Sequence, residues 1–366
     1  MRIVYVLTSL GMGGAERQTI ALAEWMASRG HTIAFVVLRS HQPEEWPTRL
    51  DVLYLDIFKS PRSIIIGLIR ARRFLKAFRP DLVHSHTYHA NLVARLLKLL
   101  TPTQVVSTMH NVYEGGRLRM LAYCLTDSLA GRTTAVSEAV AQHAIESHAV
   151  PARKCLVFPN AFDTNAFAPD RERRIETRDK FGAGDDFIWL AAGRIVSAKG
   201  FVNLLKAFSE VWGVHPHTQL WIAGSGTGDS SRKTRYSALA VHKGTMDRVR
   251  RLGLSRDMPA LLDAADGFVL ASAWEGMPLV VGEAMAMEKP VVATDVGGVS
   301  ELVGDTASLV PARNPDALAE AMLKVMQQTP ATRRTQGREA RARIVTHFNT
   351  AIRFPEWEAF YRSFCL

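Results

Sequence analysis

The chain has 366 residues, 47% of them hydrophobic and 22% charged, a balance typical of globular proteins and not of disordered or fibrous ones. Lysine and arginine outnumber aspartate and glutamate by 45 to 35, so the formal charge of +10 favours anionic partners: phosphorylated ligands, acidic lipid or nucleic acid. Nucleic acid is disfavoured, because no aromatic stacking set or binding motif of that class accompanies the charge. The length allows two domains, each with its own core.

The three cysteines, Cys124, Cys155 and Cys365, are far apart and suggest neither a disulfide framework nor a Cys-x-x-Cys site. We therefore expect reduced cysteines and a cytoplasmic location. The apolar run from Ile3 to Leu10 ends at a glycine-rich turn without a clear cleavage site, which favours a first strand over a signal peptide. The sequence contains no run of about 18 apolar residues, so we predict no membrane-spanning helix.

The first half of the chain alternates apolar strands with helices, which is typical of a parallel sheet covered on both faces. Strands are expected at 3–7, 32–38, 82–84, 104–108 and 132–136, and helices at 16–29, 64–78, 90–99 and 137–146. Turn formers and prolines over 158–170, followed by a charged run over 171–180, mark a domain boundary. We therefore predict an N-terminal Rossmann-like domain over residues 1–165.

The second half repeats the pattern and predicts another Rossmann-like domain, over residues 166–347. Its strands are expected at 187–192, 219–223, 267–270 and 291–294, and its helices at 200–212, 259–264, 278–287 and 315–328. The fold class is therefore α/β. Ligands of such sheets bind beyond the carboxyl ends of the strands.

Polar and glycine-rich motifs follow four strands of the second half at those ends. Arg194 and Lys199 come after the first strand and can converge on one polyanion, although two surface cations are the alternative explanation. Glycine-rich loops over 224–226 and 295–298 follow two other strands. Together with the loop of Glu275, these motifs favour a site for a nucleotide diphosphate.

Glu275 and Glu283 flank the start of a predicted helix. Pro278 suits a first helical turn, so Glu275 falls in the loop and Glu283 inside the helix. The free N–H groups at Met277 to Leu279 favour an anion beside Glu275. Taken alone, such a pair is more often a cap and a solvated helix position.

Three other chemistries fit the sequence less well. A nicotinamide enzyme is disfavoured because Glu16 replaces the third glycine of the fingerprint after the first strand. A glycosidase is disfavoured because eight helical residues span about 12 Å, more than the carboxylate separation of most hydrolases, and a helix-embedded Glu283 is a poor nucleophile. His84, His86 and His89 lack carboxylate or cysteine partners at ligand spacing, which favours structural or cleft-lining roles over a metal site.

The ordered motifs along the whole chain closely resemble those of the GT-B retaining glycosyltransferases of family 4. The motifs are Gly-Gly-Ala-Glu-Arg at 13–17, Gly193-Arg194 with Lys199-Gly200, Ala264-Ala265-Asp266, the two-glutamate motif from Glu275 to Glu283, and residues 291–298. The resemblance implies two Rossmann-like domains facing each other across a cleft. It also implies a terminal helix, within residues 348–366, that crosses back to the N-terminal domain.

The resemblance also implies roles for individual residues. Glu275 and His110 would act at the transferred sugar, and no metal or other cofactor would be needed because cations stabilise the leaving group. The remaining donor contacts would be Gly13, Gly14, Arg194, Lys199, Arg256, Gly276, Met277, Pro278, Leu279 and Glu283. The resemblance implies that the base would lie near 252–256 and favours a UDP-sugar as the donor. Residues 229–251 depart from the family pattern in being rich in basic and small residues.

We therefore expect a retaining transferase that moves a hexose or N-acetylhexosamine to a lipid-linked or polysaccharide acceptor in surface glycan synthesis. A sugar-nucleotide epimerase and a catalytically silent sugar-nucleotide-binding protein remain alternatives.

Basic and apolar residues interleave over 63–79 and 117–125, which predicts docking on an anionic membrane, with a core helix as the alternative for 63–79. The sequence does not predict the oligomeric state.

Overall fold

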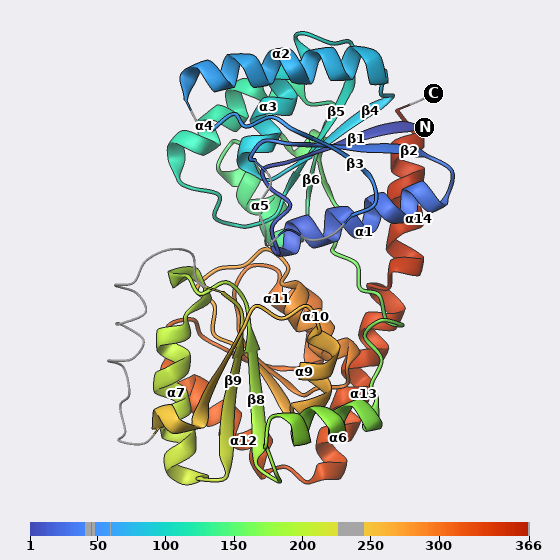
Figure 1. Cartoon of the computed structure of the whole chain (residues 1–366). Coiled ribbons are helices and arrows are strands. Elements are labelled where there is room, and N and C mark those ends of the chain that lie inside the picture. Colours follow the sequence, from blue (N-terminus) through green and yellow to red (C-terminus); the bar gives the residue numbers. More distant parts are fainter. Residues whose placement is uncertain (41–44, 46–47, 59, 226–244, 365–366) are drawn as a thin grey trace. The chain divides into compact units, whose positions relative to one another are not determined.

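The chain folds into two compact units in a computed structural model that describes residues 1–40, 45, 48–58, 60–225 and 245–364. The N-terminal unit comprises Met1–Ala161 and Ala351–Leu366, and the C-terminal unit comprises Phe162–Thr350. Each unit is a parallel sheet with helices on its faces (Figure 1). The predicted α/β class with two Rossmann-like domains is confirmed.

The N-terminal unit is built on seven described strands in the order β3-β2-β1-β4-β5-β6-β7. They are β1 (Arg2–Leu7), β2 (Thr32–Val37), β3 (Asp51–Tyr54), β4 (Leu82–His86), β5 (Gln104–Met109), β6 (Arg132–Ala135) and β7 (Cys155–Val157). The helices are α1 (Gly14–Ser28), α2 (Pro61–Phe78), α3 (Tyr88–Lys98), α4 (Arg117–Thr126), α5 (Glu138–Glu146) and, from the end of the chain, α14 (Thr350–Arg362).

Helix α14 is tied to the N-terminal unit by aromatic packing. Its Trp357 ring lies 4.2 Å from that of Phe158, centroid to centroid, and its Tyr361 hydroxyl lies 2.5 Å from Nδ1 of His84 on β4. Trp357 and Tyr361 are both buried in the same apolar cluster as β1. The last helix therefore completes the core of the unit that contains the first strand.

The C-terminal unit is built on six described strands in the order β10-β9-β8-β11-β12-β13. They are β8 (Phe187–Ala192), β9 (Thr218–Ala223), β10 (Val249–Gly253), β11 (Gly267–Leu270), β12 (Val291–Thr294) and β13 (Ser308–Val310). The helices are α6 (Arg171–Lys180), α7 (Phe201–Val214), α9 (Met258–Ala264), α10 (Leu279–Ala286), α11 (Val299–Val303), α12 (Pro315–Gln327) and α13 (Pro330–His347).

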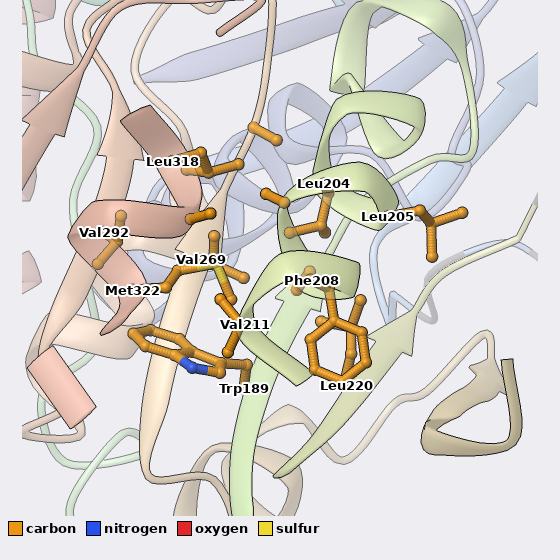
Figure 2. Packing of buried hydrophobic residues seen from close by; sticks show 14 of the residues in the cluster. Trp189, Leu204, Leu205, Phe208, Val211, Leu220, Val269, Val292, Leu318 and Met322 are labelled. Carbon is orange, nitrogen blue, oxygen red and sulfur yellow. The ribbon is translucent and has the colours of Figure 1, made fainter. Parts of the chain in front are cut away.

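One face of the second sheet is covered by α7 and α12. Phe208 of α7 and Met322 of α12 pack with Trp189 of β8, Leu220 of β9 and Val269 of β11 in one buried cluster (Figure 2). Burying a side chain of this size contributes roughly 1.5–3 kcal/mol. The cluster therefore fixes the central strands on which the strand-end loops depend.

The charged run over 171–180, for which we predicted no element, forms α6. Asp170 caps this helix by accepting bonds from the backbone N–H groups of Glu172 and Arg173. Arg173 then pairs with Asp263 at 2.5 Å, and Arg174 pairs with Asp266 at 2.6 Å. A helix that packs through ion pairs has no apolar stripe, so the sequence periodicity did not reveal it.

Four strands that the sequence patterns missed, β3, β7, β10 and β13, all lie at sheet edges. Their residues are mostly half-buried or exposed, whereas the central strands are almost fully buried. Half-exposed strands need fewer apolar residues, which weakens their sequence signal.

None of the described helices has the length and hydropathy needed to cross a bilayer.

Candidate functional site

The loops after the strands of the second sheet meet at its carboxyl edge. The backbone N–H of Ala273, after β11, donates to the carbonyl of Ala198, after β8, at 2.7 Å. The N–H of Gly298, after β12, donates to the carbonyl of Gly276 at 2.7 Å. The structure therefore places the loops of Arg194, Lys199 and Glu275 at one edge of one unit.

Two glycines allow these loops to touch. Gly200 has φ of 61°, and a Cβ there would overlap the carbonyl oxygen of Ala271. Gly297 has φ of 56°, and a Cβ there would overlap the carbonyl oxygen of Glu275. Both positions need a residue that tolerates positive φ and has no side chain. These glycines are therefore explained by contact between loops, before any ligand is considered.

Glu275 is a buried carboxylate held by two donors. Lys199 Nζ and Ser272 Oγ each donate to its Oε1 at 2.6 Å, and Glu275 is only 6% exposed. Ser272 is itself fixed, because Thr294 Oγ1 donates to its carbonyl at 2.7 Å. Sequence reasoning missed Ser272 and Thr294; a hydroxyl residue at each strand end was the only available signal.

Arg194 and Lys199 differ in their surroundings. The Lys199 side chain is 20% exposed and is neutralised locally by its ion pair with Glu275. The Arg194 side chain is exposed and makes no ion pair with the residues that the structure describes. Of these two cations, Arg194 is therefore the one whose charge no described carboxylate neutralises.

Helix α10 begins one residue later than we predicted. Pro278 has ψ of 120°, so it precedes the helix as N-cap instead of standing in its first turn. Met277 and Leu279 are buried, 5% and 9% exposed. Glu283, in the second turn of α10, is a buried carboxylate at 3% exposure.

Arg256 lies in the exposed loop between β10 and α9, at the same carboxyl edge. Residues 229–244 of the segment that departs from the family pattern lie outside the described residues. The remainder, from 245 on, forms a short 3-10 turn (Thr245–Arg248) and then the edge strand β10. Strand β10 therefore lies in a segment for which the basic composition had led us to predict no strand.

In the N-terminal unit, Gly13 and Gly14 follow β1 and open α1. Gly13 is the N-cap, and its carbonyl accepts the first helical bond from Arg17 at 3.1 Å. A Cβ on Gly13 would overlap the carboxylate of Glu16, which also accepts a bond from Ser9 Oγ at 3.3 Å. Glu16, which departs from the dinucleotide fingerprint, thus fills the space beside Gly13.

His110 follows β5 directly and packs against the histidines of β4. Its Nε2 lies 2.9 Å from Nδ1 of His86, and its backbone N–H donates to Glu114 at 3.0 Å. Burial lowers the pKa of His110 to about 4, so its ring is neutral at pH 7. Burial also raises the pKa of Glu114, to which Tyr123 donates a bond at 2.7 Å.

His84 is a structural residue. It is fully buried, with Nδ1 at 2.5 Å from the Tyr361 hydroxyl and Nε2 at 2.6 Å from Thr108 Oγ1. Across the described part of the chain, no three histidine, cysteine, aspartate or glutamate side chains are grouped so as to hold a metal ion.

Both halves of the chain match known families. Residues 12–166 match the family described as Glycosyltransferase Family 4, and residues 186–328 match the one described as Glycosyl transferases group 1. The chain is 27% identical over 340 residues to glycogen synthase of Mycobacterium tuberculosis, covering 86% of this chain and 76% of that protein. It is 25% identical over 310 residues to UDP-Gal:alpha-D-GlcNAc-diphosphoundecaprenol alpha-1,3-galactosyltransferase of Escherichia coli, covering 81% and 78%.

Solved structures share the fold across the whole chain. The crystal structure of Anabaena Alr3699/HepE in complex with UDP-glucose superposes with a TM-score of 0.88 at 21% identity, covering 99% of this chain and all of that one. WaaG, a glycosyltransferase involved in lipopolysaccharide biosynthesis, superposes with a TM-score of 0.77 at 16% identity, covering 98% of each chain. With the two family matches in tandem and this shared architecture, the chain belongs to the GT-B glycosyltransferases of family 4 and group 1.

Proposed function

We propose that the chain is a retaining transferase that moves a hexose or N-acetylhexosamine from a UDP-sugar to a lipid-linked or polysaccharide acceptor in surface glycan synthesis. The observation that carries this proposal is the cluster of Lys199, Ser272 and Glu275, where a carboxylate and a cation meet at the carboxyl edge of the second sheet. The complex of HepE with UDP-glucose and the named acceptor of the E. coli galactosyltransferase support the donor and acceptor classes.

The diphosphate of the donor would bind Arg194 and Lys199. An ammonium group has three N–H donors, and Glu275 uses one of those of Lys199. Two N–H groups therefore stay available for phosphate oxygens, so Lys199 can hold Glu275 and the leaving group together. Arg194 adds a guanidinium fork and stabilises the charge that develops on the diphosphate, so we propose that no metal is required.

The rest of the donor would be held by the α10 turn and two neighbouring residues. Backbone groups from Gly276 to Leu279, with Pro278 fixing the turn, would bind phosphate and sugar, because the helix begins there. Glu283 would accept bonds from ribose hydroxyls, and Arg256 would lie near the base. Gly13, Gly14 and His110 of the N-terminal unit would contact the phosphate and the transferred sugar.

Glu275 is better suited to positioning the sugar than to attacking it. Both of its donors bind Oε1, so Oε2 keeps its lone pairs for a sugar hydroxyl. Two donors on a carboxylate stabilise its charge and lower its nucleophilicity. This favours attack by the acceptor on the face that the diphosphate leaves, with leaving-group phosphate assisting deprotonation, over a covalent glycosyl intermediate.

A panel of nucleotide sugars, followed for nucleotide release with and without a diphospholipid acceptor, tests the proposed function. We expect acceptor-dependent release, most with a UDP-sugar, and a product that keeps the anomeric configuration of the donor by NMR. Glu275→Gln should lower turnover by at least about tenfold, the worth of one charge-assisted bond. Full turnover in that variant, or a trapped glycosyl adduct on Glu275, would contradict its role.

The same assay separates the two alternative functions. Isomerised sugar without an acceptor would identify an epimerase, and binding of a nucleotide sugar without turnover would identify a silent binding protein. Inversion of the anomeric configuration would exclude the retaining mechanism while leaving transfer intact.

We also propose that the N-terminal unit docks on the anionic inner leaflet of the membrane. The basic-apolar surface on α2 and α4 supports this, and α3 contacts both helices. The apolar side chains that this surface exposes are Ile64, Ile65, Ile66 and Ile69 of α2 and Leu118, Leu121 and Leu125 of α4. Its basic residues are Arg62, Arg70, Arg72, Arg73, Lys76, Arg117 and Arg119. The sequences of the two helices contain no aspartate or glutamate. Such a surface matches apolar chains beneath phosphate headgroups.

A further inference from the structure

Two histidines from neighbouring strands of the N-terminal unit share one short contact. His86 ends β4, His110 follows β5, and His86 Nδ1 lies 2.9 Å from His110 Nε2. A contact of this length between two ring nitrogens holds one proton, which one ring donates and the other accepts. The two rings therefore cannot choose their tautomers independently.

Both rings are neutral at pH 7. Burial lowers the pKa of His86 well below 6.5, and it lowers that of His110 to about 4. A neutral imidazole carries one N–H. If His86 donates from Nδ1, its Nε2 is bare and His110 carries its proton on Nδ1. If His110 donates from Nε2, its Nδ1 is bare and His86 carries its proton on Nε2.

The surroundings of His86 Nε2 distinguish these two arrangements. This nitrogen is buried and has no hydrogen-bond partner among the described residues. Buried N–H groups without an acceptor are rarer in proteins than buried acceptors without a donor. Gln18 lines the same small cavity, and its Oε1 already accepts the backbone N–H of Ala161 at 3.2 Å, which leaves its amide N–H groups as donors. A bare Nε2 on His86 fits this cavity.

We propose that His86 fixes His110 in the Nδ1–H tautomer, so that His110 offers a hydrogen-bond donor to a hydroxyl oxygen of the transferred sugar. His86 is then a positioning residue, and the sugar must carry an oxygen at the position that His110 reaches. The contact with the sugar rests on the proposed function, whereas the tautomer does not. The backbone of His110 is anchored separately, through Glu114 and Tyr123, so a change at residue 86 acts on the ring.

Long-range proton–nitrogen NMR of the protein labelled with ¹⁵N-histidine, without any substrate, tests the tautomer directly. We expect a protonated Nδ1 and a bare Nε2 for His110. In His86→Phe, which keeps a ring but removes the donor, the His110 signals should move toward the Nε2–H tautomer. His89→Gln is the matched control: His89 also lies near the end of β4 but contacts Phe58 and Tyr88, not His110. A bare Nδ1 in the wild-type spectrum overturns the proposal, even if His86→Phe fails to fold.

A kinetic comparison tests the consequence for the sugar. We compare kcat/KM for the best donor with that for deoxy analogues lacking one hydroxyl each. Wild type should discriminate against one analogue by about tenfold, the worth of one hydrogen bond, and His86→Phe should lose that discrimination. Equal discrimination in both proteins overturns the role of His86 in specificity. If the NMR result holds but no donor turns over, the proposed function has failed and the tautomer assignment has not.

Discussion

At the scale of single residues, the candidate site depends on the orientation of one carboxylate. Glu275 is buried, and its Oε1 receives bonds from Lys199, 76 positions earlier in the chain, and from Ser272. The sequence predicted Glu275 and Lys199 as parts of a donor site but not their ion pair. Their meeting depends on β8 and β11 being neighbours in the sheet, which strand periodicity alone cannot specify.

The hydroxyl of Ser272 should matter for turnover. In Ser272→Ala, Glu275 keeps Lys199 but loses its second donor, and its carboxylate gains freedom to rotate. A hydrogen bond to a charged group contributes about 1.5–3 kcal/mol, so we expect kcat to fall by at least about tenfold, with a smaller change in the KM for the donor. Steady-state kinetics with varied donor measures both constants.

Thr306→Ala is the control for this substitution. The hydroxyl of Thr306 also donates a hydrogen bond, to the carbonyl of Val303 at 2.7 Å, but Thr306 precedes β13 and so lies at the opposite edge of the sheet. Its kcat should equal that of wild type. An unchanged kcat in Ser272→Ala would show that Lys199 alone suffices to orient Glu275.

At the scale of elements, the sequence predicted the buried strands and eight of the helices that the structure contains. Strand β11 matches its predicted bounds, and the loop of Glu275 follows it as expected. The edge strands were missed because they lack continuous apolar runs, and α6 was missed because it packs through the ion pairs of Arg173 and Arg174. Helices α4, α11 and α13 were not predicted either. Interactions that depend on partners distant in the chain leave little local pattern.

Helices α2 and α4 should bind anionic membranes. Sedimentation with phosphatidylcholine vesicles, with and without phosphatidylglycerol, measures this. We expect pelleting only with the anionic vesicles, weakened by salt because charges contribute. The double substitution Ile65→Ser and Leu118→Ser removes side chains that are 62% and 82% exposed and should weaken pelleting.

The matched control for the vesicle experiment is Ile175→Ser, on α6 of the other unit, where the isoleucine is 51% exposed. It should pellet like wild type, because α6 is not part of the basic-apolar surface. No pelleting with anionic vesicles, or equal pelleting with neutral ones, would contradict the proposed docking surface.

At the scale of the whole molecule, the N-terminal unit should be sensitive to acid. Burial lowers the pKa values of His84, His86 and His110, so the folded unit holds them neutral, while the unfolded chain protonates them below about pH 6.5. The unfolded state then binds more protons, and the free energy of unfolding falls as the pH drops, by about 1.4 kcal/mol per pH unit for each histidine. Above about pH 6.5 the three histidines are neutral in both the folded and the unfolded state, so they add no further pH dependence to the free energy of unfolding.

Urea unfolding of the N-terminal unit at about pH 7.5 and about pH 5.5 measures this effect. Between the two conditions, wild type should lose more stability than His84→Gln, which has one fewer histidine to protonate on unfolding. Protonation of carboxylates changes the stability of both proteins equally, so it cancels in the comparison. The same loss in both proteins would show that His84 is not held neutral by the fold.

Binding of UDP, measured by isothermal titration calorimetry, tests most directly whether the carboxyl edge of the second sheet holds a donor diphosphate. We expect wild type to bind UDP, and Arg194→Gln and Lys199→Gln each to lose at least about tenfold in affinity, since each removes a charge-assisted bond to phosphate. Lys206→Gln, an exposed lysine within α7, should bind like wild type. Absence of UDP binding in wild type, or equal affinity in all four proteins, would contradict the assignment.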